Sequence, residues 1–137
     1  MSLKMSMTEE DKQLLLKDLC ARLSYGVKVK IFDNDVLPYD SEEGFIVGKE
    51  NIKDDYFVIQ CSRYSWNLSY NNIKPYLRPI SSMTKEEMEE YSVFFNYDGI
   101  EYPSEYVDWL NAHHFDHRGL IPMGLALEAP EDMYKTK

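Results

Sequence analysis

All three histidines of the chain fall between positions 113 and 117, inside the stretch WLNAHHFDHRG. A carboxylate and a guanidinium accompany them in the same stretch. Imidazole and carboxylate groups at such close spacing are the side chains that bind divalent metals or exchange protons. The first candidates for a binding site are therefore Trp109, His113, His114, Asp116, His117 and Arg118.

A metal site would depend on the helix that this stretch is expected to form. Residues four apart lie on one face of a helix, so His113 and His117 could bind one ion together. Two ligands are too few for a zinc site, and the stretch lacks the Glu of the HExxH motif. In the alternative of a metal-dependent hydrolase, Asp116 or His114 would supply the third ligand and the metal would polarise water.

A structural role explains more of these residues. Ser104 is expected to cap the helix at its start, and Gly119 is expected to follow its last turn. His117 and Arg118 would then complement the negative end of the helix dipole. Asp116 is unfavourable at that end unless a cation pairs with it. We therefore favour no metal, assign no catalytic residue and expect no cofactor.

Composition limits the remaining functions. The chain has 137 residues, of which 44% are hydrophobic, and its formal net charge is −9. These values predict a single domain over 1–137, with mobile ends at 1–7 and 131–137. The acidity argues against direct nucleic-acid binding. Neither a membrane span nor a secretory signal is evident, so we expect a cytoplasmic protein. Cys20 and Cys61 are expected to be buried in the core.

The pattern along the chain predicts an α+β fold. An amphipathic helix starts after Thr8, and alternating runs then predict an antiparallel meander of three to five strands, with a small SH3-like barrel as an alternative form of that meander. Pro75 and Pro79 place the run IKPYLRP at an edge or on the surface. Thr84 and Glu87 form a capping box, so two helices, one after Thr84 and one after Ser104, are expected to pack against the sheet.

Three segments resemble a family of small uncharacterised bacterial proteins that are often carried on prophages or other mobile elements. The segments are KDLCARLSYGVKVK, IKPYLRPISSMT and DWLNAHHFDHRGLIPMGLALEAPEDMY, which together cover roughly two fifths of the chain. The resemblance implies a genomic setting but no activity. The sequence departs from the family at Ser24, where a Pro is usual, and at His117, where a Tyr is usual. This departure weakens the metal interpretation.

We therefore expect a small non-enzymatic binding or regulatory protein that acts through contact with a protein partner. Its expected surfaces are the end of the third helix and the stretch RYSWNLSYNN around Trp66, whose mixture of aromatic, Asn and Ser residues is typical of binding surfaces. Burial of one face of a strand is the alternative explanation for that mixture. An acidic mimic of nucleic acid, which would occupy the basic groove of a partner, is a further alternative. The oligomeric state stays open.

Overall fold

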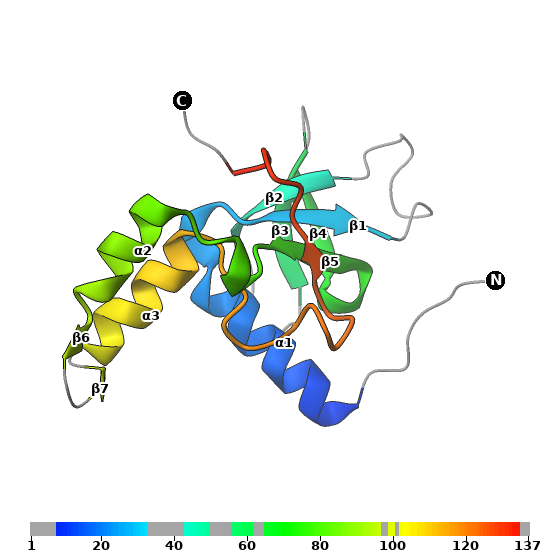
Figure 1. Ribbon diagram of the computed structural model, residues 1–137. Coiled ribbons are helices and arrows are strands. Elements are labelled where there is room, and N and C mark those ends of the chain that lie inside the picture. Colours follow the sequence, from blue (N-terminus) through cyan, green and yellow to red (C-terminus); the bar gives the residue numbers. More distant parts are fainter. Residues whose placement is uncertain are drawn as a thin grey trace.

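The computed structural model of the chain describes residues 8–32, 43–49, 56–61, 65–96, 99–100 and 102–134 (Figure 1). The fold is α+β: an N-terminal helix, a six-stranded sheet and then two helices. No helix among these residues is long and apolar enough to cross a membrane. The elements are α1 (Glu9–Ala21), β1 (Lys28–Ile31), β2 (Glu43–Gly48), β3 (Tyr56–Gln60), β4 (Ser65–Ser69), β5 (Ile73–Leu77), α2 (Lys85–Ser92), β6 (Phe95–Asn96), β7 (Gly99–Ile100), α3 (Pro103–Ala112) and β8 (Leu127–Glu128).

Helix α1 begins where the sequence predicts. The Thr8 side chain accepts a hydrogen bond from the Asp11 backbone N–H, and acidic residues fill the first turn, where the helix dipole favours them. The buried face carries Leu15 and Leu19. Cys20 is exposed, so the expectation of two buried cysteines is correct only for Cys61.

The sheet contains the predicted antiparallel meander, in the order β4-β3-β2-β1-β5-β8. β5 adds a fifth antiparallel strand beside β1, whereas β8 is parallel to β5. The sheet is therefore mixed. Among the described residues it is also open, with β4 and β8 as its outer strands, so the SH3-like barrel is not formed. Closing a barrel would require the outer strands to pair with each other. The apolar face is instead covered by α1 and by the segment after α3, as Figure 1 shows for the helix.

Strand β5 corrects the prediction for IKPYLRP, because it lies between β1 and β8. The reason is the local hydrogen-bond pattern. Phe32 N–H donates to the Asn72 carbonyl, and the alternation of the antiparallel ladder then makes Pro75 a non-hydrogen-bonded partner of Val29. The Pro75 nitrogen thus faces away from β1, and on that side β8 pairs only with the two residues after it. The missing N–H costs no ladder bond.

Two apolar clusters hold the fold together. The larger lies between the sheet, α1 and the segment 120–126. The smaller combines Met83, Leu110 and Phe115 with the partly buried rings of Tyr91, Tyr106 and Trp109, and it packs α2 against α3 beside the sheet. These two helices stand together at the left of Figure 1. The region 113–121, which holds the candidate site, connects the two clusters.

Tyr134 anchors the end of the described chain, in the tail that the sequence predicts to be mobile. Its hydroxyl accepts a hydrogen bond from Lys28 N–H at 2.9 Å and donates one to the Tyr76 carbonyl at 2.7 Å. Because Lys28 and Tyr76 follow the register of β1 and β5, the hydroxyl bridges two strands where their direct ladder stops. Residues 135–137 lie outside the described chain, as do residues 1–7.

The packing around Gly44 in the sheet leaves no room for a larger side chain. An added Cβ would lie 2.6 Å from Ile59 Cγ2 and 2.9 Å from the Gln60 carbonyl oxygen, whereas a Cβ at Gly48 would meet nothing within 4 Å. Gly44→Ala is expected to lower the free energy of unfolding by about 1 to 3 kcal/mol through overpacking. Gly48→Ala, the matched control, should change it by about 0.5 kcal/mol or less. Urea unfolding of both variants checks this, and equal stabilities would contradict the packing described.

Candidate functional site

Helix α3 begins earlier and ends earlier than the sequence predicts. It begins at Pro103, with Tyr102 as N-cap, because the fixed φ of proline suits the first helical position; the predicted cap Ser104 lies inside the first turn. It ends at Ala112, before the predicted end at Gly119. There Phe115 N–H donates to the Leu110 carbonyl and His114 N–H to the Asn111 carbonyl. This pair of bonds is a Schellman motif.

His114 occupies the position of that motif that glycine usually fills. Its φ is 65°, and it is the only non-glycine residue with positive φ in the described part of the chain. An L residue is strained in this conformation, although histidine tolerates it better than most. The chain turns sharply there, so His113 and His117 do not share a helix face. The proposed pairing of these two histidines on one metal therefore lacks its geometric basis.

The two histidines face different partners. His113 Nδ1 lies 3.3 Å from Glu87 Oε2, and its ring packs 4.3 Å from that of Trp109. His117 Nε2 instead lies 2.8 Å from Asn111 Oδ1 and 3.2 Å from Arg118 Nη1. Among the described residues no group of three or more His, Cys, Asp or Glu side chains is arranged to hold a metal ion.

A buried ion network lies beside this turn. Asp18 on α1 and Arg22, the residue that follows the last turn of α1, are both fully buried. Arg22 donates Nε–H to Asp18 Oδ2 at 2.8 Å and Nη2–H to Asp18 Oδ1 at 3.0 Å. Arg118 donates to the same Oδ1 at 2.8 Å. The Arg22 Nη2 group also donates to the Phe115 carbonyl at 2.6 Å. One carboxylate therefore links α1 to the segment that follows α3.

Arg78 holds the same segment from the other side. Its backbone N–H donates to the His114 carbonyl at 2.7 Å, its carbonyl accepts from Asp116 N–H at 2.8 Å, and its guanidinium lies 4.2 Å from the centre of the Phe115 ring. The guanidinium also makes two hydrogen bonds to Glu87, at 2.6 and 2.8 Å. These bonds lower the pKa of Glu87 to about 2 against the opposing effect of burial. The capping-box glutamate of α2 is thus tied to the turn after α3.

Asp116, which the sequence could not explain, is a backbone cap. Its two carboxylate oxygens accept from Leu120 N–H at 2.8 Å and from Ile121 N–H at 3.0 Å, and the residue is buried. It therefore begins the turn at 120–124 in the way an N-cap begins a helix. The expected pairing with a histidine or with Arg118 is not what holds it.

His114 and His117 are kept neutral by their surroundings. Burial is the main cause that lowers the pKa of each to about 4, and nearby arginines add to it. The His114 ring stacks on Tyr134 with centroids 3.7 Å apart, which joins the turn to the end of the described chain. Its Nδ1 and the Arg22 Nη1 are buried nitrogens with no hydrogen-bond partner within the described structure.

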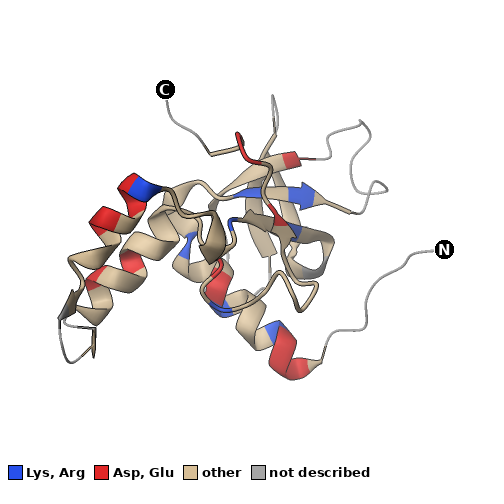
Figure 2. Cartoon of the chain, in the orientation of Figure 1, with Lys and Arg blue, Asp and Glu red and all other residues tan. Residues whose placement is uncertain are grey.

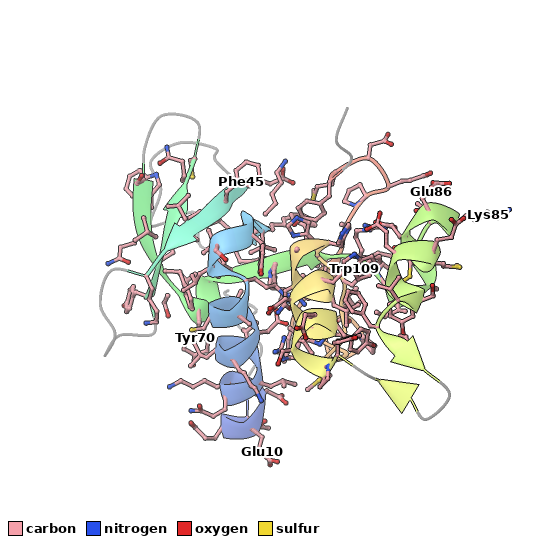
Figure 3. All side chains as sticks on the ribbon, turned by 90° about the vertical axis from the view of Figure 1, so that its left-hand side faces the viewer. Glu10, Phe45, Tyr70, Lys85, Glu86 and Trp109 are labelled. Atoms are coloured by element: carbon pink, nitrogen blue, oxygen red, sulfur yellow. The ribbon has the colours of Figure 1, made fainter. Side chains whose placement is uncertain are left out.

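The two tryptophans also pack against the apolar clusters. Trp109, labelled in Figure 3, lies among aromatic rings and donates Nε1–H to Glu90 at 3.1 Å. Trp66 lies on β4 opposite Ile59 and packs against the larger core. None of the predicted binding residues is classed as exposed. The predicted residues are therefore partly or fully buried and contact other parts of the chain, and their role in binding stays a prediction.

The sequence analysis missed the residues that organise this site. Asp18, Arg22 and Arg78 carry most of its charge-assisted hydrogen bonds. The sequence does contain a signal for Asp18 and Arg22. On α1 they fall at helical spacing with Leu15 and Leu19, so an acid and a base four residues apart lie on an apolar face. Charged residues are buried in this way only when they are paired.

The buried histidines should make stability depend on pH. Unfolded His binds a proton below about pH 6.5, whereas folded His114 and His117 do so only near 4. The free energy of unfolding should therefore fall as pH drops from about 6.5 to 5, by on the order of 1 to 2 kcal/mol for each histidine. His114→Asn and His117→Gln should each reduce this slope in urea titrations. An unchanged slope in both variants would show that neither ring is buried and neutral.

The site as a whole is a set of charge-assisted hydrogen bonds around one backbone turn. What it can do chemically is fix the geometry of α1, α3 and β5 relative to one another. The chain matches no known family model, and neither the curated proteins nor the solved structures include a significant match to it.

Proposed function

We propose that this protein is a small non-enzymatic binding protein that acts through contact with another protein, and that the contact surface is the outer face of its sheet. The resemblance to uncharacterised bacterial proteins supports a setting on a prophage or another mobile element. We prefer this surface to the one expected at the end of α3, because the candidate residues there are at least partly buried and contact other parts of the chain.

One observation carries the proposal: large apolar side chains are exposed together on the face of the sheet opposite α1. Phe32, Phe45, Val47 and Tyr56 are each 44% to 54% exposed. They project outward because their neighbours Ile31, Ile46 and Phe57 point into the core. Figure 1 shows α1 against the inner face and α2 and α3 beside the sheet, so no described helix covers this patch. Large apolar side chains exposed on one face are typical of interaction sites.

The alternatives receive less support. A hydrolase would need its histidines and Asp116 directed toward a common point, whereas they are bound to separate structural partners. A nucleic-acid mimic would need its acids aligned on one surface. The described acids are instead spread over the three helices, β2, β8 and the segments after α3 and β8 (Figure 2).

Site-specific photo-cross-linking in the native host tests the proposal. A photoreactive phenylalanine analogue at position 45 should give a discrete cross-link to one partner protein, because that side chain projects from the outer face. The same analogue at Lys17, which is exposed on α1, is the matched control and should give none.

Two results would contradict the proposal. One is the absence of any cross-link from positions 32, 45 and 56 at native expression levels. The other is a cross-link of equal yield from Lys17, because contact would then not be specific to the sheet. In either case the folded state of each variant should first be verified by its unfolding midpoint.

A further inference from the structure

We infer that the outer face of the sheet, here called the lysine-aromatic face, takes an acidic, apolar-containing segment of a protein partner. The face is defined by Lys28, Lys30, Phe32, Phe45, Val47, Tyr56 and Lys74. The inference rests on the proposed function and specifies the chemistry of the partner.

The first support is a cross-strand pair of like charges. Lys30 on β1 lies directly opposite Lys74 on β5, and on its other side it lies opposite Glu43 on β2, which offsets part of the positive charge. The two ammonium groups lie 5.8 and 5.2 Å from the centre of the same Phe32 ring. Like charges at opposed positions weaken a sheet. A position that breaks this rule is a candidate for function, since an arriving carboxylate would reduce the repulsion while its neighbouring apolar side chain covers the ring.

The second support is a repeat of the same combination at the other end of β1. Lys28 lies opposite Phe45 on β2, and its ammonium group lies 5.6 Å from the centre of that ring. Lys28 also forms an ion pair with Glu43 at 3.3 Å. Cation and ring therefore occur together at both ends of the strand. A partner segment along β1 would meet positive charge beside apolar surface at each end.

Charge contrast within the molecule strengthens this assignment. The whole chain carries a formal charge of −9, yet Glu43 is the only acid among the described residues that the register places beside these three lysines. Figure 2 shows basic residues on β1, while the described acids of α1, α2 and α3 lie on other elements. An acidic segment would be attracted to this face and repelled by the helices, which gives orientation as well as affinity.

A protein segment fits the face better than single-stranded nucleic acid does. Both could use lysines and aromatic rings. A nucleic acid, however, carries a charge at every phosphate and would be repelled over its length by a protein of charge −9. A peptide can limit its carboxylates to the two ends of β1.

The test uses a random-peptide display library as probe, with selection on the wild-type protein and affinity measurement of the selected peptides. We expect enrichment of Asp and Glu beside apolar residues, and binding that weakens by about tenfold or more between low salt and about 0.5 M salt. Lys30→Gln with Lys74→Gln should weaken binding by about tenfold, whereas the matched control, Lys17→Gln with Lys85→Gln, removes the same charge elsewhere and should not. Figure 3 shows Lys85 on α2, far from Phe45.

Phe45→Ala separates the possible failures. If the selected peptides lose affinity for Phe45→Ala but bind the lysine variants as tightly as the wild type and at every salt concentration, the acidic-segment inference is overturned and the proposed surface stands. If the peptides also bind Phe45→Ala as tightly as the wild type, both the acidic-segment inference and the proposed surface are overturned. Tighter binding of an oligothymidine of about 20 nucleotides than of any selected peptide would overturn the choice of a protein partner.

Discussion

The buried carboxylate of Asp18 is the group on which the arrangement of this structure depends. It receives hydrogen bonds from Arg22 and Arg118, and Arg22 continues to the Phe115 carbonyl. Charged groups are costly to bury, and contact with the segment after α3 gives Asp18 and Arg22 hydrogen-bond partners beyond each other. Arg78 holds the same segment from the side of β5 and α2. These arginines fix the backbone around the three histidines, and the histidines consequently lie beside separate partners instead of around a common point.

The same packing determines which residues face outward. Side chains alternate along a strand, so once Val29 and Ile31 are fixed against the core, Lys28, Lys30 and Phe32 must point to the opposite face. The buried network therefore supports the proposed binding surface indirectly, by holding α1 on one side of the sheet only. The two faces of the sheet therefore differ: polar groups near the inner face hold the helices in place, whereas the exposed rings and lysines of the outer face make up the surface that we propose for binding.

Much of the fold could be predicted from local signals. The Thr8 cap, the Thr84 and Glu87 capping box and the alternation of β1 to β4 each depend on neighbouring residues, and the structure confirms them. The errors involve contacts between distant positions. The sequence predicts that α3 ends at Gly119, but the helix ends at Ala112, and His114 takes the left-handed conformation. The turn that follows makes hydrogen bonds to Arg22 and Arg78, which lie far away in the sequence. Asp116 could not be understood without the backbone of 120–121, and Pro75 was tolerated because β8 is short. The residue pattern of one strand or helix does not specify which distant residue will contact it in the fold.

A double-mutant cycle between Asp18 and Arg118 tests most directly whether the buried carboxylate joins α1 to the histidine-containing segment. The free energy of unfolding would be measured by urea for Asp18→Asn, Arg118→Gln and the double variant, with Asp11→Asn and Arg118→Gln as a control cycle on the same helix. The structure predicts a coupling of about 1.5 to 3 kcal/mol for Asp18 with Arg118, and about 0.5 kcal/mol or less for the control. Additive effects in both cycles would contradict the account, because the two segments would then be held together by something other than this carboxylate.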